Sequence, residues 1–169
     1  MILAAKNPYL FGSGVTASCG ALLHLLIPIG GPEWYAFFGA PRGMVQMARN
    51  GDLHAPISCV LIATLLIFFA IYAFSGAGLL RRLPLLRSVL VCIGGILILR
   101  GLVFIPLILW RANALVNICG DCRNINIFVV LTSLLCLGLG LGYAVGTRKH
   151  WHELGIRARC EVSGLRIDK

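Results

Sequence analysis

An apolar run from residue 88 to residue 110 constrains this chain more than any other feature, because a single charge, Arg100, lies inside it. A helix of about 20 apolar residues crosses the hydrocarbon core of a bilayer, so the run predicts a membrane-spanning helix. An arginine at such a depth costs roughly 2.5–3.5 kcal/mol on insertion scales. We therefore expect Arg100 to face the interior of a helix bundle and to have a polar partner there.

Three further apolar segments accompany this run and predict the fold class. The residues are 59% hydrophobic and only 12% charged, whereas an average soluble domain has about 25% charged residues. We expect one transmembrane domain at residues 1–147, an all-α integral membrane four-helix bundle. Its predicted spans are residues 10–29, 56–80, 88–110 and 125–145.

The distribution of basic residues predicts the topology. Four spans place both termini on one side, together with the turn that contains Arg81, Arg82 and Arg87. That side carries ten Lys and Arg residues, whereas the two longer loops on the other side carry four. Because positively charged segments stay in the cytoplasm, we expect both termini to be cytoplasmic, including a basic tail at residues 148–169.

The net charge of +9 also bears on the partners of the chain. We expect the lipid bilayer as the main partner, with anionic lipid at the basic tail and at the Arg81, Arg82 and Arg87 turn. No nucleic-acid partner is expected, because no stacking aromatic residues alternate with these charges as they do in single-strand binders. A homo-oligomer or a larger membrane complex stays open as a further partnership.

The loop between the first two spans has the character of a membrane interface. The aromatic residues within 34–38 follow directly after the first span, as in the aromatic belts of membrane proteins. Residues 41–50 predict a short amphipathic helix at the membrane surface. Further along, we expect Pro56 in the first turn of the second span and Ser88 as the N-cap of the third.

Arg100 defines the first candidate site, a ligand-binding pocket that opens outward. No aspartate or glutamate lies within the four predicted spans, so neutral groups such as His24, Tyr72 and Ser75 are its candidate partners. A guanidinium offers five donors to an anion, a lipid head group or a quinone-like carbonyl. The alternative for Arg100 is a structural arginine that donates to carbonyls and hydroxyls. For His24, the alternative to ligand binding or proton relay is packing.

Cys119 and Cys122 form the second candidate site, in the loop at residues 111–126. Two thiols at this spacing can form a reactive disulfide and carry out redox catalysis. The alternatives are a structural loop disulfide and free thiols. We expect no metal site, because structural zinc needs about four ligands. The pair would find its remaining ligands, Asp52 and His54, only in another loop.

The fourth span contains a glycine at every fourth position, namely Gly138, Gly142 and Gly146. Such a doubled G-x-x-x-G pattern lets another helix approach closely. The pattern predicts helix packing, either within the bundle or at the contact of a homo-oligomer.

The Cys119 and Cys122 pair, next to a predicted helix end, resembles quinone-linked membrane thiol oxidases and vitamin K epoxide reductase-like proteins. Those proteins are also four-helix bundles, and the resemblance covers only the number of helices and this motif. It implies a thiol–disulfide oxidoreductase with quinone as its cofactor. The chain departs from that pattern, because no second cysteine pair lies in an outer loop to relay electrons.

Residues 72–87, with the sequence YAFSGAGLLRRLPLLR, and residues 98–101, with the sequence ILRG, resemble short inner-membrane proteins of proteobacteria that have no assigned function. This resemblance covers about the middle third of the chain. It implies a multi-pass protein of the bacterial inner membrane with four helices. It also directs attention to Ser75, Arg100 and Gly101.

We expect a non-enzymatic membrane protein without a cofactor. It would be an accessory subunit, or a small protein that binds lipid or another amphiphile in a pocket around Arg100. One alternative is a membrane thiol–disulfide oxidoreductase that uses Cys119 and Cys122. Another is a small transporter or channel, although the absence of carboxylates and of repeats in the predicted spans disfavours it.

Overall fold

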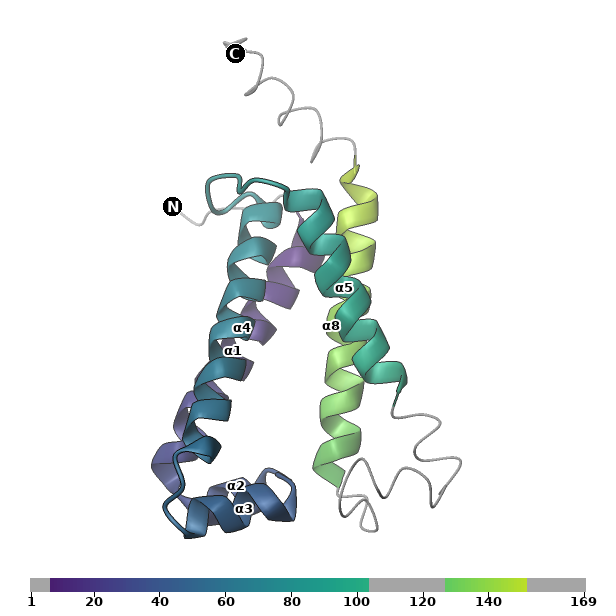
Figure 1. Cartoon of the computed structure of the whole chain (residues 1–169). Helices are drawn as coiled ribbons and strands as arrows, with labels where there is room; N and C mark the ends of the chain where they lie inside the picture. The colour runs from purple at the N-terminus through teal and green to yellow at the C-terminus, as the bar shows by residue number, and fades with distance from the viewer. Residues whose placement is uncertain (1–6, 104–126, 152–169) are drawn as a thin grey trace.

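The computed structural model describes residues 7–103 and 127–151 of the 169-residue chain. These residues form helices joined by turns, and they contain no strand, which confirms the all-α class (Figure 1). In chain order, the helices are α1 (Pro8–Gly30), α2 (Pro32–Phe37), α3 (Arg42–Arg49), α4 (His54–Ala77), α5 (Leu86–Leu102) and α8 (Ile127–Lys149).

Three of the helices are long and apolar enough to cross a membrane, and they overlap the first, second and fourth predicted spans. The third predicted span, residues 88–110, begins within α5, whose 17 residues end near the limit of the described region. Residues 104–110 of that span lie outside the described residues. The chain thus has the helices of a multi-pass membrane protein, at Pro8–Gly30, His54–Ala77 and Val130–Lys149.

Helices α1 and α4 form one antiparallel pair in which small residues line the contact (Figure 1). On α1, Ala17 and Ala21 are buried, and a Cβ added at Gly14 would lie 2.8 Å from the ring of Phe74. Small side chains let two helices approach closely, which is how helices associate in lipid. Five alanines of α4 are also buried: Ala55, Ala63, Ala70, Ala73 and Ala77.

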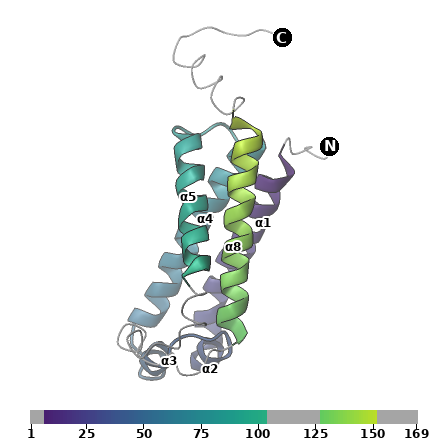
Figure 2. The same cartoon turned by 90° about the vertical axis from the view of Figure 1, so that its right-hand side faces the viewer.

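Helices α5 and α8 form the second pair and lie side by side in both views (Figure 2). A Cβ added at Gly140 of α8 would lie 2.7 Å from the Ile98 side chain and 2.8 Å from the Ile98 backbone nitrogen. A Cβ at Gly101 of α5 would lie 2.9 Å from Cβ of Leu137. The two backbones therefore approach as closely as glycine allows.

The two pairs join at the end of the molecule that contains the start of α1, the turn at residues 78–85 and the end of α8 (Figure 1). There Tyr143 is 0% exposed, and its hydroxyl donates to the Phe69 carbonyl at 2.8 Å. Asn7 caps α1 by accepting from the Leu10 amide, and its amide group donates to the Gly146 carbonyl at 2.9 Å. We call this the basic end, because it contains Arg81, Arg82, Arg87, Arg148 and Lys149.

At the opposite end, here called the far end, α2 and α3 cross the ends of the long helices (Figures 1 and 2). Helix α3 confirms the short amphipathic helix predicted for residues 41–50. Tyr35 of α2 lies in a small core with Ile27 and Cys59. The rings of Phe37 and Phe38 reach Phe128 of α8, with centroids 5.2 and 6.0 Å apart.

The turn between α4 and α5 differs from the prediction. The second predicted span ends three residues early, at Ala77, because Gly78 has φ of 83° and closes the helix in a left-handed conformation. The prediction that Ser88 caps α5 is wrong, since the helix already begins at Leu86 and Ser88 lies in its first turn. The earlier start buries Leu86 in the core of the basic end. Pro56 lies in the first turn of α4, as predicted.

Candidate functional site

Arg100 lies in the last turn of α5, and its side chain is exposed. Residues seven positions apart share a face of a helix, so Arg100 continues the stripe that contains Leu86 and Ile93. Those two residues are 5% and 2% exposed in the core of the basic end. Arg100 is close enough to the Cys136 thiol of α8 to interact with it electrostatically. The face that carries Arg100 thus passes from the core into the region where the two pairs diverge (Figure 1).

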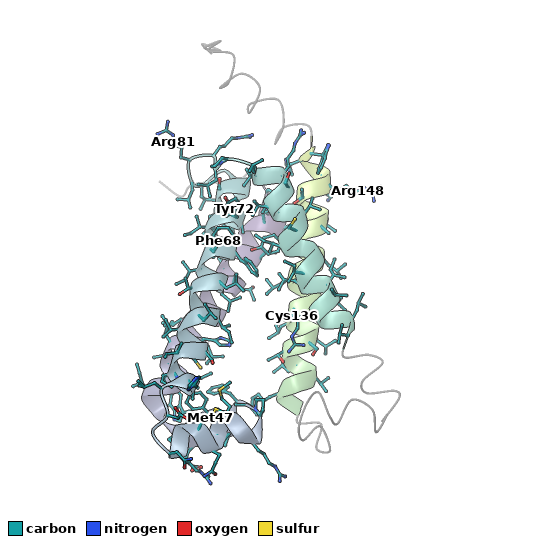
Figure 3. All side chains as sticks on the ribbon, in the orientation of Figure 1. Met47, Phe68, Tyr72, Arg81, Cys136 and Arg148 are labelled. Carbon is teal, nitrogen blue, oxygen red and sulfur yellow. The ribbon has the colours of Figure 1, made fainter. Side chains whose placement is uncertain are left out.

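His24 and Tyr72 are two of the expected partners of Arg100, and each of them contacts a residue one turn earlier in its own helix. Nδ1 of His24 lies 2.8 Å from the Gly20 carbonyl oxygen, one turn earlier in α1. Tyr72 packs against the core of the basic end, and its ring centroid is 4.7 Å from that of Phe68 (Figure 3). Both side chains are half-buried.

Ser75 lies at a different depth from Arg100. Its hydroxyl donates to the Arg81 carbonyl at 3.0 Å and accepts from the Leu83 amide at 3.1 Å, just before α5 begins. Arg100 lies near the other end of α5, about 20 Å further along the helix. The structure therefore does not bring Ser75 and Arg100 into one site, and Ser75 instead fixes the turn.

The glycines of α8 divide between its two neighbours. A Cβ at Gly142 would collide with the Ser13 hydroxyl of α1, and a Cβ at Gly146 would lie 2.7 Å from Leu10. A Cβ at Gly138 would meet nothing within 4 Å. The predicted stripe thus packs against α1 at two of its three positions, while Gly140, which the four-residue pattern omits, packs against α5.

The candidate redox pair, Cys119 and Cys122, lies outside the described residues. The four cysteines that the structure describes are free: Cys19, Cys59, Cys92 and Cys136. In the described ranges, no three His, Cys, Asp or Glu side chains gather in an arrangement that would hold a metal ion.

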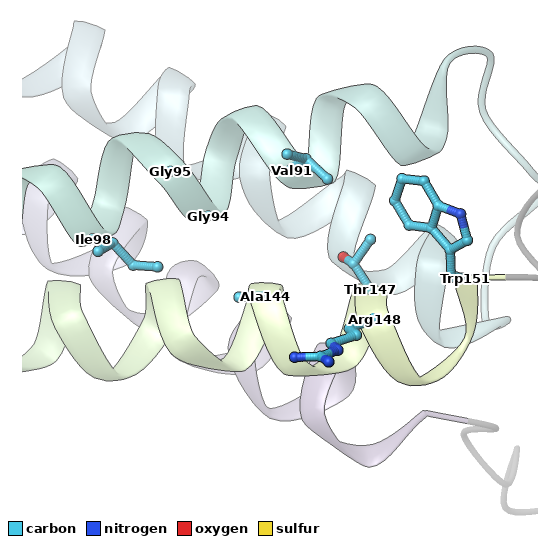
Figure 4. A pocket seen from close by; sticks show the side chains of 8 residues that line it. All are labelled: Val91, Gly94, Gly95, Ile98, Ala144, Thr147, Arg148 and Trp151. Atoms are coloured by element: carbon cyan, nitrogen blue, oxygen red, sulfur yellow. The ribbon is translucent and has the colours of Figure 1, made fainter.

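A groove of about 390 Å³ lies between α5 and α8, near the basic end (Figure 4). We call it the α5–α8 groove. On α5, the two adjacent glycines Gly94 and Gly95 leave space between the side chains of Val91 and Ile98. On α8, it is lined by Ala144, Thr147 and Arg148, and Trp151 lines it two residues after the helix ends.

The polar groups of the α5–α8 groove lie toward one end of it. Thr147 is 2% exposed, and its hydroxyl has no hydrogen-bond partner among the described residues. Arg148 follows it on α8, and Trp151 stands one turn further along (Figure 4). Arg87 lies over the Trp151 ring, 4.9 Å from its centroid, and donates to the Trp151 carbonyl. The groove is therefore apolar along its length and cationic where it meets the basic end.

The described charged side chains around this site have one sign. All described acidic residues, Glu33 and Asp52, lie at the far end, where Glu33 pairs with Arg49 at 3.2 Å and Asp52 with His54 at 3.2 Å. The described part of the basic end contains only basic charged side chains. An anionic group at the mouth of the groove would meet no carboxylate among the residues that the structure describes.

Sequence reasoning missed the α5–α8 groove, although two signals for it exist. Gly94 and Gly95 interrupt an apolar helix, and Trp151 follows two basic residues at the end of another. The pairing of α5 with α8, which brings these signals together, is visible only in the fold. No family model, curated protein or solved structure compared with the chain matches it.

Proposed function

We propose that the chain is a non-enzymatic multi-pass membrane protein that binds an amphiphile in the α5–α8 groove. The observation that carries this proposal is the groove itself, an apolar channel with a buried, unpartnered Thr147 hydroxyl and with Arg148 and Trp151 at one end. Ligand sites are concave and mostly apolar, with a few placed polar groups. The α5–α8 groove is apolar along its length and polar at one end, and an amphiphile likewise has an apolar chain with a polar head group at one end.

The dimensions of the groove fit a lipid chain within one leaflet. From Val91 to Ile98 it follows α5 for about 10 Å, roughly a third of the thickness of the hydrocarbon core. Several residues along it, among them Val91, Gly95 and Ala144, are exposed, so the groove is open toward the side of the helix pair. In a membrane that side is occupied by acyl chains.

The proposed membrane arrangement has four spans, with residues 88–110 forming the one that begins in α5. Both termini lie in the cytoplasm, and the membrane is a bacterial inner membrane. The five described cations of the basic end support this orientation through the positive-inside rule. They would also attract anionic lipid to the tail and to the Arg81, Arg82 and Arg87 turn.

The proposal keeps a lipid-binding role but moves it away from Arg100. Val91 lies nine residues before Arg100, which corresponds to about 180° of rotation around α5. The groove residues and Arg100 thus occupy opposite sides of the same helix. A ligand in the groove would not contact Arg100.

Filling the groove tests the proposal. A Cβ at Gly95 meets nothing within 4 Å, so Gly95→Leu places a side chain in the groove without disturbing the packing. Gly138→Leu is the matched control, because Gly138 is equally unobstructed but lies outside the groove. Native mass spectrometry of the purified proteins counts the lipids that remain bound. We expect Gly95→Leu to lose a bound lipid that Gly138→Leu retains, and equal retention by both variants would refute the proposal.

A further inference from the structure

We propose that the α5–α8 groove selects an anionic glycerophospholipid. One acyl chain lies over Gly94 and Gly95, an ester carbonyl of the lipid accepts from Thr147, and the phosphate pairs with Arg148. This inference rests on the proposed function and adds the chemical class of the ligand. Three features support it: the unpartnered Thr147 hydroxyl, the Arg148 side chain next to it and the charge of the basic end.

The Thr147 hydroxyl differs from the other described threonines in this chain. In a helix, a threonine hydroxyl usually donates to the carbonyl one turn earlier, where its bond is internal. Thr16 does so to Gly12 at 3.0 Å, and Thr64 does so to Val60 at 2.8 Å. Thr147 has no such bond, although it is 2% exposed. A buried donor without an acceptor is rare in folded proteins, and here it lines the groove, so an acceptor on the ligand would complete it.

Arg148 supplies a positive charge next to Thr147, where the phosphate of the lipid would lie. It follows Thr147 directly on α8 and lines the same groove, and its side chain is exposed. A guanidinium binds phosphate through two parallel hydrogen bonds. In a glycerophospholipid the phosphate lies next to the ester groups, so one molecule can reach both residues while its acyl chain follows the groove.

Trp151 closes the polar end of the groove, and α5 holds it there. Arg87 in the first turn of α5 stacks on its ring and donates to its carbonyl. Tryptophan is favoured at the level of the lipid head groups, because its ring is apolar and its N–H is polar. This contact fixes the depth of the groove relative to the membrane surface and sets the head group beside Arg148.

The sign of the described charges favours an anionic head group over a zwitterionic one. A choline or ethanolamine group would approach Arg148, Arg87 and Lys149 without any carboxylate among the described residues of the basic end. An uncharged or anionic head group avoids that repulsion, and each basic residue near the surface adds attraction for an anionic lipid. The inference therefore commits to a phospholipid with net negative charge, such as phosphatidylglycerol.

The charge is tested by competition between two lipids. The full-length protein is reconstituted in nanodiscs of equimolar phosphatidylcholine and phosphatidylglycerol, and native mass spectrometry gives the ratio of the two lipids that stay bound after release. We expect Arg148→Gln to weaken the binding of both lipids, because both contain a phosphate, and to lower the preference for phosphatidylglycerol about fivefold through the lost net charge. Arg81→Gln removes the same charge at the same end outside the groove, and we expect it to leave the ratio within about twofold of wild type.

The hydroxyl is tested by Thr147→Val, which keeps the shape of the side chain. Both lipids contain ester carbonyls, so we expect the variant to bind each of them about two- to tenfold more weakly, without a change in their ratio. In lipid-free detergent the same variant should unfold at a higher temperature than wild type, because it removes a buried donor that lacks an acceptor. A merely structural Thr147 would lower that temperature.

Three outcomes separate the inference from the function on which it rests. If wild type retains both lipids equally while Gly95→Leu retains neither, the groove binds amphiphiles without selecting anions, and only the inference fails. If Arg81→Gln and Arg148→Gln lower the preference equally, the selectivity belongs to the surface potential of the basic end, and the inference also fails. If Gly95→Leu binds both lipids like wild type, the proposed function itself fails.

Discussion

The two ends of this molecule hold the same two helix pairs together by different means. At the basic end, the pairs share a continuous core, and hydrogen bonds from Asn7 and Tyr143 cross between them. At the far end, the rings of Phe37 and Phe38 contact Phe128 of α8. Lipid gives helices little hydrophobic reason to associate, so packing and interhelical hydrogen bonds decide where they stay together.

This difference explains where a ligand site can form. At the basic end, the Asn7 and Tyr143 side chains that join the helices are buried and hydrogen-bonded. The α5–α8 groove lies beside that core, so the packing of the core holds the groove residues in place. A selective binding site needs such support. Arg100, by contrast, lies where the pairs have already diverged. The comparison predicts that substitutions at the basic end cost more than equivalent ones at the far end.

The largest effect is expected for Tyr143→Ala. Removing a fully buried aromatic side chain costs about 3–5 kcal/mol, and the bond to the Phe69 carbonyl is lost with it. Phe38→Ala at the far end, where the ring is half-buried, should cost about 1 kcal/mol. Unfolding of each variant in mild detergent, followed by circular dichroism, gives the comparison. Equal losses would show that the far end is joined as firmly as the basic end.

The next effect concerns the glycine contact within the second helix pair. Gly140→Leu would press a side chain against the Ile98 backbone nitrogen, only 2.8 Å from the added Cβ, and backbone cannot move aside as a side chain can. Overpacking of this kind costs about 1–3 kcal/mol. Gly138→Leu, two residues away with open space around it, should be neutral or slightly stabilising. The same unfolding assay decides, and a stable Gly140→Leu would mean that α5 and α8 are not in direct contact.

The sequence predicted the helices well, because length and hydropathy are local properties. Three predicted spans match α1, α4 and α8 to within about three residues at most ends. The amphipathic pattern at residues 41–50 likewise predicted α3. Ser88 failed as a cap because burial of Leu86 in the core overrides the local signal.

The candidate site was less predictable, because it depends on which helices pair. Charge alone pointed to Arg100, and charge is visible in a sequence. The Thr147 hydroxyl is informative only once its usual acceptor is seen to be unused and its neighbours on α5 are known. Likewise, a four-residue glycine repeat predicted Gly142 and Gly146 as contacts with another helix but gave no reason to single out Gly140.

The smallest expected effect concerns Tyr35 at the far end. Tyr35 is 3% exposed there, and its hydroxyl lies beside the Cys59 thiol. Burial, together with the neighbouring Cys59 thiol, raises the pKa of Tyr35 from 10.0 to about 12. The folded state thus holds the phenolic proton more tightly than the unfolded state does. Its contribution to stability is complete below about pH 10 and is lost as the pH rises toward 12.

Tyr35→Phe isolates this titration, since it keeps the ring and removes the proton. Between about pH 9 and about pH 11, we expect wild type to lose about 1 kcal/mol more of its unfolding free energy than the variant does. At neutral pH, the variant should differ little from wild type in stability, because the Cys59 thiol is only a weak partner for the hydroxyl that the variant lacks. If the unfolding free energies of wild type and Tyr35→Phe change equally with pH, the Tyr35 hydroxyl is in contact with water. Water would then reach Tyr35 at the far end. The two ends would differ more in their packing than the structure indicates.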